Sequence, residues 1–315
     1  MARLARYCWF VLFYNFAVIA WGAYVRATGS GAGCGAHWPL CNGEMMVRPE
    51  SVKQAIEFSH RVTSGLALVT VVVMVLWAWR ITKAGHPARL GAGLSLGFML
   101  SEAALGAGLV LFGLVDTDSS PARAFAVSAH LLNTFLLLAS LTLAVYWTSG
   151  GAHLRFDMSR RSTRSLTLGA VVLLVVSVAG AITALGDTLF PSGTLVEGLQ
   201  ADLSSSAHFL IRLRVIHPVL AVMGAIYTVV TVWPLARGSA RLQSRAWALT
   251  GLVVAQLVAG AVNVLLLAPV WLQLVHLLLA DAVWVTYLFF GADVLRGERE
   301  PVVAAQSQLT PALHN

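Results

Sequence analysis

The sequence predicts an all-α integral membrane protein with eight transmembrane helices, arranged as two tandem four-helix bundles. Three observations support this fold class. Of the 315 residues, 58% are hydrophobic and only 11% are charged. The apolar residues gather in eight runs of about 18 residues or more, the length that a helix needs to cross a bilayer. Similar phrases recur in the two halves of the chain, which indicates a duplicated unit.

The eight runs are predicted to be helical because a helix satisfies its own backbone hydrogen bonds in lipid. They cover residues 7–27, 58–79, 90–113, 124–147, 165–186, 208–235, 246–268 and 270–292. The first run ends in GAYVRATGSG, which lacks the small-residue cleavage site of a secretory signal peptide. We therefore expect it to stay in the membrane as the first helix.

The net charge of +7 reflects orientation in the membrane. If the N-terminus is cytoplasmic, most of the 21 Lys and Arg residues fall in cytoplasmic segments, for example Arg3, Arg6, Arg80 and Arg89. Positive residues concentrate on the cytoplasmic side of membrane proteins. We therefore expect a multi-pass protein of the cell membrane, surrounded by the lipid bilayer, with both termini cytoplasmic. No basic tract is typical of nucleic-acid binding, so a nucleic-acid partner is excluded.

The repeat divides the chain into two halves related by a pseudo-two-fold duplication. The first helices end in GAYVRATGSG and GAITALGDTL, and the second and fourth helices of each half carry a histidine. The predicted parts are an N-terminal half (1–148), a cytoplasmic linker (149–164), a C-terminal half (165–295) and a cytoplasmic tail (296–315).

Four of the nine histidines lie inside the predicted spans, near the outer face: His60, His130, His217 and His276. Ionisable residues inside a membrane are costly and usually face a cavity or a partner. Each imidazole could simply form a hydrogen bond between helices. Because all four occupy equivalent places in a duplicated unit, we favour pairs of axial haem ligands, one pair per half. Zinc or copper is less favoured, since no further Cys, Asp or His lies nearby in the sequence to complete a set of ligands.

Glu57 precedes His60 by three residues, which places both on one helix face. The matching position of the second half is Arg214. An acid beside one site alone suggests proton handling there, or stabilisation of developing positive charge. The alternative is that Glu57 pairs with Arg61, its neighbour one turn later, which does not exclude the first role.

Four arginines border the histidines at the outer face and are candidate contacts for haem propionates: Arg61, Arg123, Arg212 and Arg214. A guanidinium group suits a carboxylate because it binds it with two hydrogen bonds. The alternative is that these long side chains only reach toward the membrane surface.

The first outer loop contains Cys34 and Cys41, on the oxidising side of the membrane. We predict a disulfide between them. It is either a structural clip or a redox-active pair, because thiol reactivity depends on thiolate pKa and exposure. Cys8 lies in the first span and is predicted to be a packing residue.

The combination of VRATGSGAGCGAHWPLCNG, then IEFSHR, then three further intramembrane histidines resembles the haem A synthase family. This resemblance implies oxidation of the C8 methyl group of haem O to a formyl group, by successive hydroxylations through a hydroxymethyl intermediate. It also implies a cofactor haem b held by His217 and His276, and a substrate haem held by His60 and His130. Glu57 is then expected to be the catalytic residue that assists the chemistry at the methyl group, either as a proton carrier or by electrostatic stabilisation.

The resemblance also implies partners. Electrons must come from an external donor, which the sequence does not identify, and a haem O synthase that supplies the substrate is a candidate partner. Some family members have a second cysteine pair in the loop between helices five and six. Here that loop, GDTLFPSGTLVEGLQADLSSS, has no cysteine and is expected to be a plain surface loop.

Two other functions fit only part of the sequence pattern. A dihaem b-type electron carrier linked to quinone needs the four histidines but gives no use for Glu57 or the cysteine pair. A transporter built from repeats predicts broken helices and polar sites at the membrane midplane. The runs in this sequence are not conspicuously interrupted, and their polar residues gather at the outer end instead.

Overall fold

A computed structural model describes residues 1–45 and 47–296. In these residues we find ten helices and, beyond isolated bridges, no β-strand. The helices are α1 (Ala2–Ala27), α2 (Val52–Ile81), α3 (Pro87–Leu111), α4 (Pro121–Thr148), α5 (Arg161–Leu189), α6 (Leu195–Leu203), α7 (Phe209–Leu213), α8 (Ile216–Ala236), α9 (Ala240–Leu265) and α10 (Val270–Val294). Within the described chain, eight helical segments are long and apolar enough to cross a membrane. The prediction of an all-α protein with eight membrane-spanning helices is thereby confirmed, whereas the duplication of a four-helix unit stays a prediction.

Several helices begin at residues whose side chains satisfy free backbone N–H groups. Ser51 accepts from the N–H of Gln54 at the start of α2, and Ser120 accepts from the N–H of Arg123 at the start of α4. Pro87 and Pro121 occupy the first turn of α3 and α4, where the missing N–H costs nothing. These local signals fix where the second, third and fourth spans enter the membrane.

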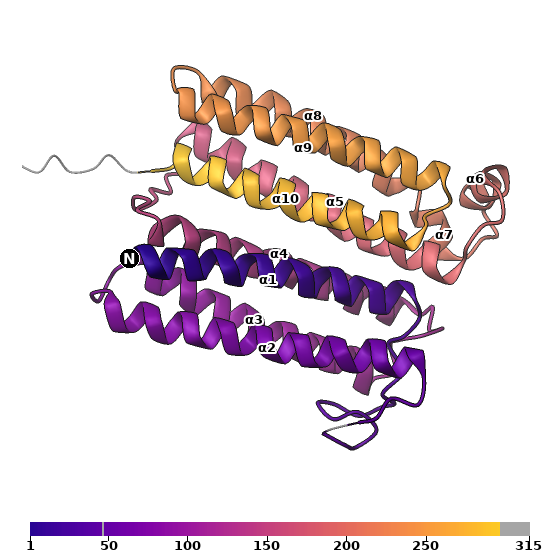
Figure 1. Cartoon of the computed structure of the whole chain (residues 1–315). Coiled ribbons are helices and arrows are strands. Elements are labelled where there is room, and N and C mark those ends of the chain that lie inside the picture. The colour runs from indigo at the N-terminus through magenta and orange to yellow at the C-terminus, as the bar shows by residue number, and fades with distance from the viewer. Residues whose placement is uncertain (46, 297–315) are drawn as a thin grey trace, which may run out of the picture.

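Figure 1 shows α1–α4 packed together on one side of the molecule and α5, α8, α9 and α10 together on the other. Helices α1, α4, α5 and α10 meet between the two groups. The core there contains Phe135, Leu138 and Leu141 from α4, together with Trp284 and Phe290 from α10. The indole N–H of Trp284 donates to the backbone carbonyl of Phe135 at 2.8 Å. Helices α4 and α10 thus form the centre of the structure.

The outward faces of the helices carry large apolar side chains. On α2, for example, Leu66, Val69, Val73 and Leu76 are exposed. Such a continuous apolar surface suits contact with lipid tails, where every backbone polar group must be satisfied within the protein.

The loop after α5 differs from the expected plain surface loop, because it contains the short helix α6. The sixth span, predicted at 208–235, is confirmed at Phe209–Ala236, with a local turn at Arg214 and Val215 that separates α7 from α8. At this turn the buried guanidinium group of Arg214 pairs with Asp187 and Asp202. These pairs connect the start of the sixth span to α5 and α6.

The predicted linker, residues 149–164, is shorter than expected because α5 begins at Arg161. Leu154 pairs with Arg296, and the N–H of Arg155 donates to the carbonyl of Leu295. The linker is therefore attached to the end of α10. Except for Arg296, the predicted tail lies outside the described residues.

Candidate functional site

The four intramembrane histidines come from α2, α4, α8 and α10, near the beginning of each span. These beginnings lie at one end of the molecule, together with α6 and the first loop, whereas the N-terminus and the end of α10 lie at the other (Figure 1). The structure therefore puts all four imidazoles toward the same end.

His217 and His276 lie close together in the C-terminal half. Their ring centres are 6.3 Å apart, and the ring planes are nearly perpendicular. The Nδ1 atom of His217 lies 3.2 Å from the carbonyl oxygen of Val176. A backbone acceptor at Nδ1 is the usual way in which a protein orients an imidazole and leaves Nε2 for a metal. The amide of Gln256 lies 3.3 Å from Nε2 of His276.

Glycines make room for both of these histidines. A Cβ atom at Gly180 would lie 3.0 Å from Cε1 of His217, and one at Gly260 would lie 3.0 Å from Cε1 of His276. Each imidazole thus rests directly on the backbone of a neighbouring helix, α5 or α9. A larger residue at either position would force the ring to move.

The C-terminal pair fits a haem iron. Two imidazoles on opposite sides of one metal ion, with metal–nitrogen bonds of roughly 2 Å, have ring centres about 6 Å apart. The observed separation of 6.3 Å agrees with that arrangement. Nδ1 of His276 is buried and has no hydrogen-bond partner among the described residues. His217 and His276 are therefore the residues that would hold a haem in this half.

The N-terminal half places its histidines in similar surroundings. A Cβ atom at Gly22 on α1 would lie 2.9 Å from Cε1 of His60, and one at Gly106 on α3 would lie 3.9 Å from Cε1 of His130. Nδ1 of His60 is buried without a hydrogen-bond partner in the described part of the chain. An unpaired buried imidazole nitrogen is costly unless a ligand or water completes it.

His130 has an acidic neighbour that sequence reasoning missed. Oε1 of Glu102, on α3, lies 3.5 Å from Nδ1 of His130. The histidine and the acid come from different helices, so no spacing in the sequence relates them. The sequence does show that Glu102 is an ionisable residue inside the apolar run 90–113. Such a residue usually has a partner within the protein.

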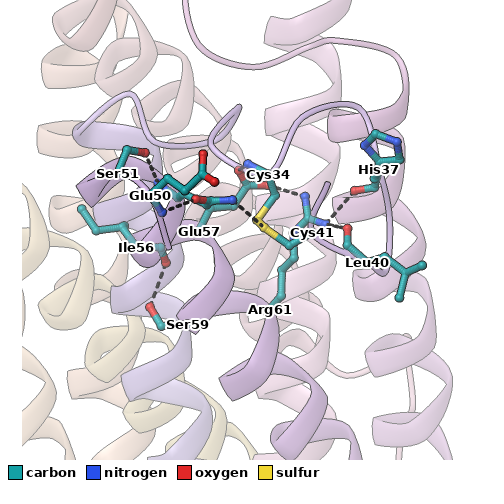
Figure 2. Close-up of a disulfide and its surroundings, with 11 residues drawn as sticks. Cys34, His37, Leu40, Cys41, Glu50, Ser51, Ile56, Glu57, Ser59 and Arg61 are labelled. Atoms are coloured by element: carbon teal, nitrogen blue, oxygen red, sulfur yellow. Dashed lines mark hydrogen bonds and ion pairs between the residues drawn. A yellow bond between two sulfur atoms is a disulfide. The ribbon is translucent and has the colours of Figure 1, made fainter. Parts of the chain in front are cut away.

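Glu57 is buried beneath the first loop, as Figure 2 shows. One carboxyl oxygen accepts a hydrogen bond from the backbone N–H of Cys34 at 2.8 Å, and the other pairs with the guanidinium group of Arg61. The expected Glu57–Arg61 pair is thus confirmed. Arg61 also donates to the carbonyl oxygens of His37 and Leu40.

The disulfide between Cys34 and Cys41 is confirmed, and both cysteines are buried. Cys8 is a buried free thiol, as predicted for a packing residue. The disulfide closes the loop around the carboxyl group of Glu57 (Figure 2). The loop, the acid and Arg61 therefore form one connected unit at the outer end of α2.

The guanidinium groups of the other arginines differ in how many hydrogen bonds and ion pairs they already form within the protein. Arg123 is buried and donates to the carbonyl oxygens of Asp116 and Asp118. Arg214 pairs with two aspartates, on α5 and α6. Arg212 is exposed and lines a cavity of about 520 Å³. Of the four arginines, Arg212 therefore has the side chain with the most access to solvent or lipid.

Comparisons with known proteins place these features in a family. A family model described as "Cytochrome oxidase assembly protein" matches residues 5–288. The chain is 50% identical over 296 residues to a "Protoheme IX farnesyltransferase" of Thermus thermophilus, an alignment that covers 93% of this chain and 49% of that protein.

Shorter alignments relate the chain to two proteins named "Heme A synthase". The one from Halalkalibacterium halodurans is 40% identical over 124 residues, which cover 39% of this chain and 41% of the relative. The one from Geobacillus kaustophilus is 35% identical over 144 residues, covering 46% and 45%. The chain spans about half the length of the Thermus relative.

Proposed function

The chain belongs to the cytochrome oxidase assembly protein family, and from this premise we propose that it is a haem A synthase. The proposed reaction oxidises the C8 methyl group of haem O to a formyl group by successive hydroxylations. The proposal rests on a difference between the two histidine sites. The residue one turn before His60 is an acid, Glu57, whereas the residue one turn before His217 is a base, Arg214. An electron carrier with two equivalent sites has no need for this difference.

We assign the substrate haem to the N-terminal half, residues 1–148, with His60 and His130 as its ligands. The cofactor haem b is assigned to the duplicated C-terminal half, residues 165–295, with His217 and His276 as ligands. A bound haem b supplies one-electron transfer. The chain's contribution there is to orient the two imidazoles, through the carbonyl of Val176 and the packing of Gly180 and Gly260.

Glu57 is the proposed catalytic group of the N-terminal half. Its burial under the disulfide loop excludes bulk water, and its contacts with Arg61 and the Cys34 N–H fix its two oxygens. A fixed, buried carboxyl group can stabilise positive charge that develops near the reacting methyl group, or carry a proton. The loop and Arg61 then act by holding it in position.

The relatives' names favour oxidation over farnesyl transfer. The family model and the "Heme A synthase" relatives support the first, whereas the farnesyltransferase name belongs to a Thermus protein that the chain covers only by half. That name also supports a haem O synthase as the partner that supplies the substrate, because protohaem is its stated substrate.

We propose that the protein lies in the cell membrane with both termini cytoplasmic and its haem sites near the outer face. The basic residues Arg241, Arg245 and Arg296 lie around Asp293, at the end of α10. The disulfide loop lies at the opposite end (Figure 1). Positive residues inside and a disulfide outside are the usual arrangement for a membrane protein.

The test is haem extraction and chromatography from membranes supplied with haem O, comparing the wild type with Glu57→Ala and with Glu50→Ala, a control at an exposed acid nearby. We expect haem A from the wild type and the control. The Glu57→Ala variant should retain haem O or its hydroxylated form.

Three outcomes would contradict the proposal. Conversion of haem b to haem O by the wild type would indicate a farnesyltransferase. Haem b alone in every variant, with identical reduced spectra, would favour the dihaem electron carrier. Haem A in equal yield from Glu57→Ala would show that the carboxyl group is not needed.

A further inference from the structure

An acid inside the membrane lies beside one of the proposed haem ligands. Glu102 belongs to α3, well within the span, and its Oε1 atom is 3.5 Å from Nδ1 of His130 on α4. Placing an ionisable residue at such a depth costs free energy, so the residue usually has a specific partner. The nearest such group here is the imidazole: Nδ1 of His130 is buried, forms no hydrogen bond with the described residues and lies 3.5 Å from Oε1.

The carboxyl group of Glu102 is held in this place by two donors from α4. Asn133 Nδ2 donates to Oε2 at 2.6 Å, and Thr134 Oγ1 donates to Oε1. The amide of Asn133 is fixed in turn, because Ser101 Oγ donates to its oxygen at 2.6 Å. Both carboxyl oxygens therefore act as acceptors, and turning away from the imidazole would break two hydrogen bonds.

The corresponding residue in the other half is an amide. Gln256 on α9 lies four residues before Gly260, as Glu102 on α3 lies four residues before Gly106, and both glycines face the histidine of the next span. The amide of Gln256 also contacts its histidine, but at the other ring nitrogen: it lies 3.3 Å from Nε2 of His276, whereas Oε1 of Glu102 lies 3.5 Å from Nδ1 of His130. Glutamate and glutamine have nearly the same shape. The two halves thus differ at this position in charge and in hydrogen-bonding capacity.

We propose that Glu102 is a positioning residue that makes His130 a more electron-donating ligand for the iron of the substrate haem, whereas Gln256 leaves the haem of the C-terminal half without this effect. A carboxylate that accepts the Nδ1–H of a metal-bound imidazole fixes its tautomer and increases the donor strength of Nε2. A more strongly donating ligand favours the oxidised iron and lowers its reduction potential. This inference rests on the proposed binding of the substrate haem at His130.

The experiment measures reduction potentials, which a purely structural role of Glu102 would not shift in a defined direction. The full-length protein, supplied with haem O and haem b, is titrated as wild type, Glu102→Gln and Glu102→Asp. His130→Ala and His217→Ala assign each signal to its half. We expect Glu102→Gln to raise the potential of the N-terminal haem, and Glu102→Asp, which withdraws the carboxyl group from the imidazole by one methylene, to raise it less, with the C-terminal haem unchanged in both.

A matched control separates charge from packing. Ser101→Ala removes the hydrogen bond to Asn133 but leaves the carboxyl group of Glu102 in place, so it should leave both potentials near the wild-type values. If Glu102→Gln does not fold, Glu102→Asp still tests the effect, because it keeps the charge and moves the carboxyl group away from the imidazole. An unchanged N-terminal potential in Glu102→Asp then overturns the inference.

Failure of the inference and failure of the proposed function give different results. If the wild type takes up a haem that His130→Ala loses, and Glu102→Gln leaves its potential unchanged, then only the role of Glu102 is overturned. If His130→Ala loses no haem, then His130 is not a ligand, and the assignment of the substrate site is overturned as well.

Discussion

Two glutamates near the proposed substrate haem have different neighbours. Glu57 contacts Arg61 and the backbone of the disulfide loop, whereas Glu102 contacts His130, Asn133 and Thr134. The first is paired with a cation, and the second has only neutral donors and an imidazole. We therefore assign chemistry at the reacting group to Glu57 and tuning of a ligand to Glu102.

Removing the guanidinium group of Arg61 should destabilise the outer loop. The Arg61→Ala variant loses two hydrogen bonds to the carbonyls of His37 and Leu40 and leaves Glu57 buried without its cation. Hydrogen bonds to charged groups contribute about 1.5–3 kcal/mol each in favourable cases. We expect thermal unfolding in detergent to occur at a clearly lower temperature.

The matched control for Arg61 is Lys53→Ala, which removes an exposed pair with Asp116 at 3.9 Å. Such a pair contributes little to stability. Equal unfolding temperatures for Arg61→Ala and Lys53→Ala would show that the buried pair does not hold the loop.

The histidines could be singled out from the sequence because they are ionisable residues inside apolar runs at matching places in the two halves, and Glu57 because it lies three residues before one of them. Sequence reasoning missed Glu102 because the contact with His130 joins two helices, and only the packing of α3 against α4 brings them together. The same reasoning explains the arginines. Their positions at the outer ends were predictable, but the buried aspartates that pair with Arg214 come from distant parts of the chain.

At the level of elements, hydropathy located all eight spans, and the helices extend beyond the apolar runs by a few residues at most ends. Val52–Ile81, for example, was predicted as 58–79, because the first turns of α2 are polar and lie under the loop. The helix α6 was not predicted because it is short and exposed, and such a helix does not appear as an apolar run in the sequence. Its place depends on Asp202, which pairs with Arg214.

The Arg214 pairs are predicted to fix α6 and the break between α7 and α8. In Arg214→Met, Asp187 and Asp202 lose their cation while remaining mostly buried. Breaking a buried pair in this way costs about 3 kcal/mol, the lower end of the usual range, because both aspartates retain some exposure. We expect limited proteolysis to cut residues 190–208 much faster than in the wild type.

Glu197→Gln provides the control on α6, because Glu197 is exposed and only caps the turn at Gly193. Arg214→Lys should keep part of the protection, since a lysine retains the charge but not the two-sided contact. Proteolysis at the wild-type rate in Arg214→Met would mean that apolar packing alone holds this segment.

At the level of the whole molecule, the two groups of helices meet along α1, α4, α5 and α10. Most of this interface is apolar, and its polar contacts include one from Arg26 at the end of α1. Its guanidinium group donates to the carbonyl of Ala184 at 2.7 Å, to Thr188 at 2.6 Å and to Gln273 at 3.1 Å. A single side chain of the N-terminal half thus binds both α5 and α10.

Arg26 lies at the outer end of the first span and is one of the few cations outside the predicted cytoplasmic segments. Its hydrogen bonds to α5 and α10 explain why a cation lies at this position. The distribution of charge across the membrane does not explain it. Because the two proposed haem sites lie in different halves, the distance between them depends on this interface. If both sites hold haem as proposed, Arg26 helps to fix the arrangement of the two haems.

The last prediction concerns the cooperativity of the two halves. In Arg26→Ala the three hydrogen bonds of a charged donor are lost, and we expect a lower unfolding temperature and a broader or divided transition, because the halves remain joined mainly by apolar packing. Thermal unfolding in detergent, followed by tryptophan fluorescence, measures this. The control is Arg48→Ala, which removes an exposed cation of the first loop. A single transition at the wild-type temperature in Arg26→Ala would show that the apolar contacts of α4 with α5 and α10 hold the halves together without it.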